Sequence, residues 1–186
     1  MTPKEEEALS RKQQILDAAA ALFAELGYYK TTTAAVAKAV GVTQPYVFHF
    51  FKTKEELYLA VLSQASQRIL HAFATVQAPP EELVEAMGHA FIDLLLEYRN
   101  EILLVMMAFA TPEEAVRDYT RREFDAVYER VKSRFENAGI PEPGREASLF
   151  ISQGLIIAMS ETLGMPKLCP WRENGPKSCT GPSSPA

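Results

Sequence analysis

The chain has 186 residues, of which 47% are apolar and 23% charged, and a formal net charge of −5. This is the composition of an ordinary globular protein, able to bury one core or a small domain beside a larger one. The longest apolar run, residues 102–110, is too short to span a bilayer, and the acidic start MTPKEEE lacks the basic region of a signal peptide. We therefore expect a cytoplasmic protein that does not enter the membrane.

The first predicted helix begins after a polar, acidic lead, residues 1–9, which we expect to be flexible. Ser10 and Gln13 have the spacing of a capping box, which predicts a helix start. Gly27 is expected to end the helix. Its apolar residues recur at helical spacing and predict one packed face: Ile15, Ala19, Leu22, Phe23 and Leu26.

Two short helices joined by a tight turn are predicted next. Thr33 can cap the first, whose Val36 and Val40 share a face, and Gly41 is suited to end it. Thr43 can cap the second. Pro45 falls in the first turn of that helix, where its missing N–H costs no hydrogen bond.

The second short helix has an inner face, with Val47 and Phe51, and an outer face. In a helix-turn-helix the early residues of the second helix contact base edges in the major groove. The alternative is a short helical corner of a bundle, but the turn length and the two following lysines, Lys52 and Lys54, favour DNA binding. The outward or early residues are Gln44, Pro45, Tyr46, Phe48 and His49.

This segment resembles the DNA-binding domain of TetR-family transcriptional repressors from about Ile15 to Leu62. The shared features are the glycine that ends the first helix, a Thr-rich entry, the pattern Ala-x-x-Val-Gly-Val-Thr, an aromatic recognition helix and Thr-Lys-Glu-Glu-Leu. Phe48 stands where this family usually has Tyr, and Phe50 where it usually has His. The resemblance implies base contacts by Gln44, Pro45, Tyr46 and Phe48, and phosphate contacts by Thr33, Thr43, His49 and Lys54.

Charge is distributed unevenly between the two ends of the chain. Residues 11–54 contain six Lys/Arg and two acids, whereas residues 61–186 contain twelve Lys/Arg and seventeen acids. A basic head attracts phosphates, and an acidic body discourages DNA from binding to the wrong face. Chance clustering remains an alternative for so small a local excess.

Five further helices are predicted. A second capping box, Thr53 with Glu56, opens a fourth helix of roughly 35 Å that ends near Val76. A fifth begins at Pro80. The sixth, residues 100–109, is nearly all apolar, and Thr111-Pro112 is expected to start the seventh, which ends near Gly139. The eighth covers residues 145–163.

The seventh helix has an arginine-rich face. Acidic residues alternate with the arginines, so we interpret this face as solvated and paired rather than as a second nucleic-acid site.

The sequence thus predicts an all-α protein with a helix-turn-helix head, residues 10–52, and a helical ligand-binding and dimerisation domain, residues 53–164. Methionines and aromatics in the later helices suit a flexible hydrophobic ligand, although most core residues look alike in sequence. The candidate pocket residues are Met87, Phe91, Leu95, Met106, Met107, Phe109, Phe124 and Tyr128. The small residues of the eighth helix let another helix approach, and the resemblance implies a homodimer interface there, with candidates Phe150, Gly154, Ile157 and Ala158.

Residues 165–186 are rich in proline and lack periodicity, which predicts a disordered tail. Its two cysteines, Cys169 and Cys179, have no histidine nearby, so we expect free thiols rather than a zinc site, and a redox pair is the weaker alternative.

No enzyme motif, metal site or cofactor site is expected, and His71 and His89 lack partners at ligand spacing. Three functions therefore compete. The first is a ligand-responsive repressor that binds operator DNA and a small hydrophobic effector. The second is a helical ligand-binding protein whose head is only structural, and the third is a small helical enzyme. The array of Gln44, His49 and Lys54 in the head favours the first over the second, and the absence of paired carboxylates on one helix disfavours the third.

Overall fold

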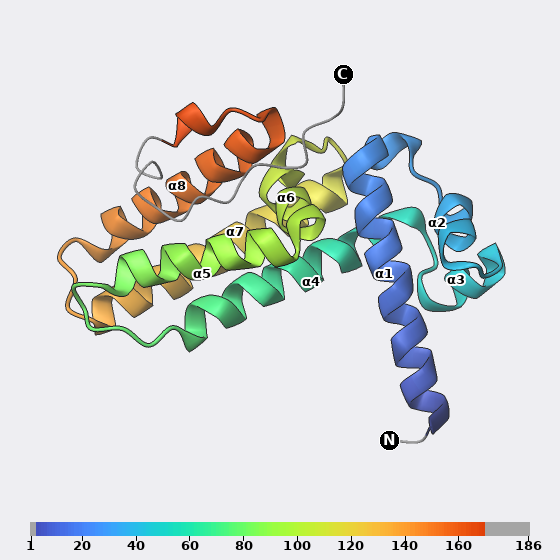
Figure 1. Ribbon diagram of the computed structural model, residues 1–186, viewed down its shortest axis with the longest axis horizontal. Coiled ribbons are helices and arrows are strands. Elements are labelled where there is room, and N and C mark those ends of the chain that lie inside the picture. The colour runs from blue at the N-terminus through green and yellow to red at the C-terminus, as the bar shows by residue number, and fades with distance from the viewer. Residues whose placement is uncertain (1–2, 170–186) are drawn as a thin grey trace.

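The computed structural model describes residues 3–169, with side chains from residue 6 onward. Across that span the regular structure is eight α-helices and two 3-10 turns without a strand, which confirms the all-α class (Figure 1). No helix in this part of the chain is long and apolar enough to cross a membrane. The helices are α1 (Pro3–Lys30), α2 (Thr33–Val40), α3 (Gln44–Phe50), α4 (Lys54–Thr75), α5 (Leu83–Glu97), α6 (Arg99–Met107), α7 (Glu114–Asn137) and α8 (Pro143–Leu163), and the turns are η1 (Ala108–Ala110) and η2 (Pro166–Leu168).

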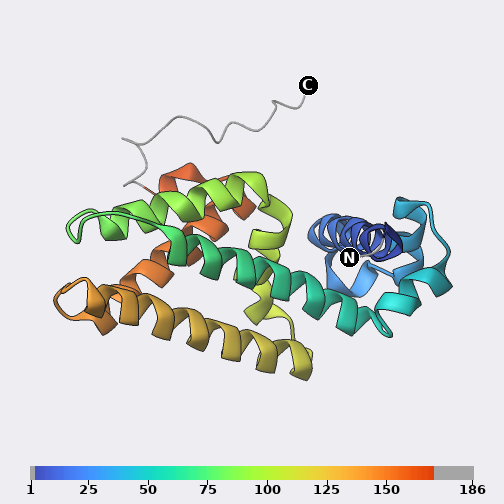
Figure 2. The ribbon, with the colours of Figure 1, turned by 90° about the horizontal axis from the view of Figure 1, so that it is seen from below.

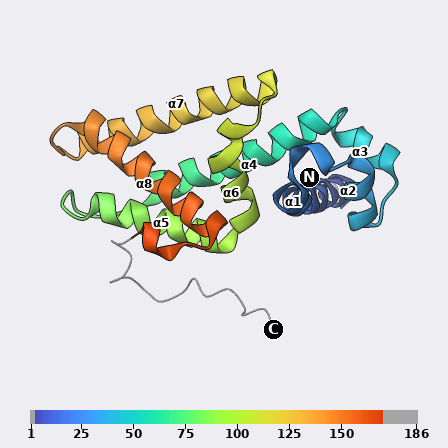
Figure 3. The same cartoon turned by 90° about the horizontal axis from the view of Figure 1, so that it is seen from above.

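Helices α1–α3 form a head and α5–α8 form a body, and α4 runs from one into the other (Figures 1 and 2). Helix α1 packs against α2, α4 and α6, so it contacts both parts. In the body, α8 packs against α5, α6 and α7 (Figure 3). A movement of α4 or α1 would therefore be felt in both head and body.

Helix α1 is longer than predicted, because it begins at Pro3 and not at Ser10. The predicted helix start at Ser10 is therefore wrong. Proline is tolerated at the first helical position, and the glutamates that follow it are good helix formers, so nothing local stops the helix earlier. Near its other end Gly27 (φ 77°) breaks the helical geometry, as expected, although one more short turn follows to Lys30. Leu26, expected on the packed face, is exposed.

The helix-turn-helix is formed by α2, a short turn and α3. The N-cap of α2 is Thr32 rather than Thr33, since the Thr32 hydroxyl accepts a hydrogen bond from the Ala35 N–H at 3.1 Å. Gly41 (φ 73°) ends α2 in the left-handed conformation that glycine adopts without strain. Helix α3 begins after Thr43 with Pro45 in its first turn, as predicted.

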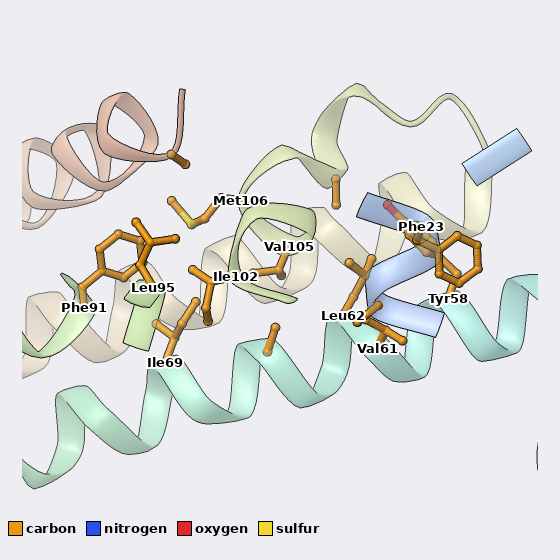
Figure 4. Packing of buried hydrophobic residues seen from close by; sticks show 14 of the residues in the cluster. Phe23, Tyr58, Val61, Leu62, Ile69, Phe91, Leu95, Ile102, Val105 and Met106 are labelled. Carbon is orange, nitrogen blue, oxygen red and sulfur yellow. The ribbon is translucent and has the colours of Figure 1, made fainter. Parts of the chain in front are cut away.

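Helix α4 begins and ends where the sequence indicates, with Thr53 as N-cap and Val76 as C-cap. The Thr53 hydroxyl accepts from the Glu56 N–H at 3.0 Å. Figure 4 shows side chains from one side of this helix packed along its length, with Tyr58 beside Phe23 at the head end and Ile69 toward Phe91 in the body. Tyr58, Leu62, Ala65, Ile69 and Phe73 form a stripe on α4 that is buried throughout.

Two body helices start later than the sequence suggests. Helix α5 begins at Leu83 and not at Pro80, because the prolines form a turn in which the Glu82 N–H donates to the Pro79 carbonyl at 3.0 Å. Helix α7 begins at Glu114, with Glu113 rather than Thr111 at the N-cap position. Thr111 instead ends η1.

The chain is ordered slightly beyond α8, contrary to the predicted tail from residue 165. The Ser160 hydroxyl donates to the Met165 carbonyl at 2.9 Å, η2 follows, and the free thiol of Cys169 is buried. Cys179 and the rest of the predicted tail lie outside the described residues.

Candidate DNA interface and ligand cavity

The outer face of α3 is exposed, and its inner face is packed into the head. Val47 and Phe51 are buried, as predicted, which fixes the rotation of this short helix. The exposed residues include every candidate from the early part of the helix: Thr43, Gln44, Pro45, Tyr46, Phe48 and His49.

Three aromatic rings on α3 pack on one another. The Phe50 ring centroid lies 5.4 Å from that of Tyr46 and 5.1 Å from that of His49, both edge to face. Such pairs restrict the rings to fixed positions in the free protein. Less side-chain entropy is then lost when these rings bind a partner. Phe50, which replaces a customary polar residue, therefore positions its two exposed neighbours.

Two of the candidate DNA-contacting residues are paired with each other. The Gln44 side-chain amide donates to the Thr33 hydroxyl at 2.9 Å, and Thr33 itself is only 7% exposed. Thr33 thus joins α2 to α3 and presents little of its own surface. The sequence missed this pairing, since the two residues are eleven positions apart and only the turn brings them together.

Lys54, a candidate phosphate contact, is bound within the protein. Its ammonium donates to the carbonyls of Tyr28 at 3.0 Å and Tyr29 at 3.4 Å, and lies 4.4 Å from the Tyr28 ring centroid. These contacts fasten the start of α4 to the end of α1. A lysine has three donors, so one N–H remains for a phosphate oxygen.

Lys54→Ala is accordingly expected to lower the free energy of unfolding by about 1–2 kcal/mol, because it removes charge-assisted hydrogen bonds and a cation–π contact. Urea denaturation measures this. Lys52→Ala is the matched control, since Lys52 is exposed and its ammonium reaches only the Phe48 carbonyl at 3.2 Å. Equal stability of the two variants would show that Lys54 does not fasten α1 to α4.

The body contains an apolar cavity of about 80 Å³ bordered by five helices, α4 to α8. Only three of the eight predicted pocket residues line it: Phe91, Met106 and Phe124. Figure 4 shows Phe91, Met106 and Ile69 converging on this region. The apolar lining residues absent from the prediction are Ile69, Phe73, Val105, Val127, Phe150, Ile151 and Ile157.

The other five predicted pocket residues lie elsewhere. Met87 and Leu95 are fully packed in the core, and Phe109 is exposed. Met107 borders a separate groove between α1 and α6, and the Tyr128 hydroxyl donates to the Gly144 carbonyl at 3.4 Å. Apolar character could not separate these residues from the cavity wall, because helix rotation decides which of them face it.

One end of the cavity is polar. Ser66, which is buried, and Glu123 both line it, and the Tyr119 hydroxyl lies close to them. Burial raises the pKa of Tyr119, and its oxygen makes no hydrogen bond of normal geometry. A ligand with one polar group would find the Ser66 hydroxyl and the Glu123 carboxylate in the cavity wall.

The residues predicted for a dimer interface on α8 do not lie on its exposed face. Phe150, Ile157 and Ala158 are buried within the chain, and a Cβ on Gly154 would lie 3.5 Å from the Met106 Cε. The opposite face of α8 is exposed and apolar. Leu149, Met159 and Leu163 are 46%, 40% and 57% exposed, and Ser152 and Ile156 continue the same stripe.

A partly buried ion pair ties α4 to α6. Arg68 Nε lies 3.0 Å from Glu101 Oε2, and the guanidinium carbon lies 3.6 Å from the Tyr98 ring centroid. Burial raises the pKa of Glu101, Arg68 lowers it, and Asp17 of α1 raises it slightly. Charges on α1 and on α4 therefore both act on this carboxylate of α6.

After Lys54 and Arg68, a third cation contacts α4, at its C-terminal end. Both terminal nitrogens of Arg134, on α7, donate to the α4 carboxyl end, at the carbonyls of Ala74 and Val76. Elsewhere the arginine-rich face is partly ion-paired, as expected, for example Arg121 with Asp118.

Within the described residues no cluster of His, Cys, Asp or Glu could hold a metal ion. An exposed recognition helix supported by α1 and α2, above a helical body with its own cavity, defines a helix-turn-helix DNA-binding protein.

Comparison with known proteins identifies the family. Residues 15–61 match the family model of bacterial regulatory proteins, tetR family. The HTH-type transcriptional regulator YhgD of Bacillus subtilis is 27% identical over 160 residues, which cover 82% of this chain and 83% of YhgD. The HTH-type transcriptional repressor Rv1474c of Mycobacterium tuberculosis is 35% identical over 65 residues, 35% of each chain.

Solved structures show the same fold over most of the chain. The SmeT–triclosan complex matches with a TM-score of 0.69 and 22% identity over 89% of this chain and 86% of SmeT. AibR in complex with isovaleryl coenzyme A and operator DNA matches with a TM-score of 0.66 and 22% identity, covering 80% and 86%. Residues 15–61 thus form a DNA-binding domain of the tetR family, and the chain is a DNA-binding transcriptional regulator.

Proposed function

We propose that the chain is a repressor that leaves a near-palindromic operator when a small hydrophobic molecule occupies the cavity. The observation that carries this proposal is the position of α4. It contributes Ser66, Ile69 and Phe73 to the cavity wall, and its first residue, Lys54, follows α3 by only a short turn. A ligand that displaces this wall would move the recognition helix.

Known relatives support the proposal by analogy. AibR has been solved with both isovaleryl coenzyme A and operator DNA, and SmeT with triclosan. Rv1474c is named a repressor. In this chain the effector would enter the cavity bordered by α4 to α8.

The proposed DNA contacts are those expected from the resemblance. Gln44, Pro45, Tyr46 and Phe48 would face bases, and Thr33, Thr43, His49 and Lys54 would contact phosphates. Since Gln44 is bonded to Thr33 in the free protein, base recognition would require this amide to rotate or to share its second N–H.

Gln44→Ala is expected to weaken operator binding by about 1–3 kcal/mol and to relax sequence specificity, because it removes one base-edge contact. The measurement is a salt titration of binding to operator and to random DNA. Gln67→Ala on the exposed side of α4 is the control. Unchanged operator affinity and specificity in Gln44→Ala would remove this residue from the recognition set.

We further propose that two copies associate through the exposed stripe of α8. Its residues recur with spacings of three and four, the repeat that packs two helices along a seam. One head offers few base contacts, whereas a dimer presents two heads to successive major grooves.

The switch requires that ligand and operator oppose each other. A hundredfold weakening of DNA binding corresponds to about 2.7 kcal/mol of coupling, and by reciprocity the operator must weaken ligand binding by the same factor. Calorimetric titration of an inducing compound with and without operator tests this. Equal affinities would rule that compound out as an effector, and ligand binding without any operator would favour the alternative of a ligand-binding protein with a structural head.

A further inference from the structure

Five of the seven described glycines have a local structural role. Gly27, Gly41, Gly139 and Gly164 have positive φ angles between 62° and 77°, a conformation that other residues adopt only with strain. Gly144 is needed for space, since a Cβ there would lie 3.1 Å from the Tyr128 hydroxyl. These five positions end helices, shape turns or admit a close neighbour.

Gly88 and Gly154 have no such role. Both lie inside helices, α5 and α8, with ordinary helical backbone. A Cβ at Gly88 would have no heavy atom within 4 Å, and one at Gly154 would make ordinary contacts of 3.5 Å with Met106 and 3.9 Å with Phe91. Alanine would fit at either position and would stabilise the helix. Glycine therefore lowers the stability of each helix, and no contact in the structure requires it there.

Both glycines line the same cavity. Side chains at these positions would occupy the space that the cavity now offers. Positions that break a local rule without a structural gain are where function is expected to impose the choice.

We propose that Gly88 and Gly154 are specificity-determining residues that keep this cavity open and select a compact, mainly apolar effector. This inference rests on the proposed function, in which the cavity is the effector site. A volume of about 80 Å³ is far below the roughly 300–1,000 Å³ of pockets for drug-sized ligands. A small molecule fits without any movement of the helices, whereas a larger one enters only if α4 and α8 move apart.

The probes are xenon and benzene, which enter dry apolar cavities in proteins. Binding is followed by NMR of the methyl groups of Ile69, Val105 and Ile157, which line the cavity. We expect saturable shifts of these methyls in the wild type, and at least tenfold weaker binding of both probes in the Gly88→Ala/Gly154→Ala double variant. Each alanine should also raise Tm by roughly 2–4 °C, the shift expected for a chain of this size.

Gly139→Ala is the control for adding one methyl group. Its positive φ should make the variant less stable, while probe affinity stays at the wild-type value because Gly139 is remote from the cavity.

Three results would overturn the inference: a wild type that binds neither probe, a double variant that binds both as the wild type does, or a lower Tm in either alanine variant. Failure of the proposed function would look different. The glycines would control probe binding as described, but no ligand of the cavity would change operator affinity.

Discussion

The double variant Met159→Arg/Leu163→Arg is expected to sediment as a monomer and to bind operator at least a hundredfold more weakly than the wild type. Both side chains are exposed on the outer face of α8, so arginine does not disturb the core of the subunit. In the proposed dimer, however, it would place four uncompensated cations in an apolar seam, where charge burial is costly. A monomer holds only one head on the DNA and loses the contacts of the second half-site.

Sedimentation at micromolar concentration and operator titration measure the two effects, and thermal unfolding checks that the subunit remains folded. Ala126→Arg, on the exposed side of α7, is the control for an added surface cation. A wild type that is monomeric at micromolar concentration, or a double variant that stays dimeric, would refute this use of α8. Gly154→Arg is unsuitable for the purpose, because that position faces the cavity.

Arg68→Met should lower the free energy of unfolding by roughly 2–3 kcal/mol at neutral pH, since it leaves the buried carboxylate of Glu101 without its cation. The loss is below that of a fully buried pair because the Arg68 side chain is 25% exposed.

The loss should depend on pH in a defined direction. The folded-state pKa of Glu101 already lies above its ordinary value of 4.5, so its ionisation penalises the folded state as pH rises from that value through the folded pKa. Without Arg68 this pKa rises further. The stability gap between variant and wild type should therefore be largest at neutral pH and shrink as pH falls through the raised folded-state pKa, below which Glu101 is protonated in the folded state of both proteins.

Urea denaturation across this pH range tests the prediction. Adding Glu101→Gln to Arg68→Met removes the charge and should recover much of the loss at neutral pH. A gap that is independent of pH and persists in the double variant would mean that Arg68 stabilises the fold only by packing on Tyr98.

Sequence patterns determined the head and α4 well, because there local signals and burial agree. Thr53 and Glu56 mark a start, Gly41 marks a stop, and the long stripe of α4 is buried on one side. Helix starts in the body were less predictable. Thr111 has the residue type of an N-cap, but in the folded chain it ends η1, and α7 begins only after Glu113. No local sequence pattern encodes this arrangement.

The candidate sites show the same limit. The residues exposed on α3 followed from helical geometry alone, since one apolar face is strongly marked. In α8, large apolar residues occur on both faces, and only the folded chain shows that Phe150 lines the cavity while Leu163 is exposed. The contacts of Lys54 with the end of α1 depend on residues 25 and 26 positions away and leave no trace in the local sequence.

Footprinting of the purified protein on its own promoter DNA would show whether α3 recognises a specific operator as part of a dimer. We expect protection of a near-palindrome whose half-site centres lie one helical turn apart, roughly 34–36 Å. Protection should weaken when the outward side chains of α3, such as Gln44 and His49, are replaced by alanine. Uniform protection of all DNA, or a footprint that these replacements leave unchanged, would contradict it.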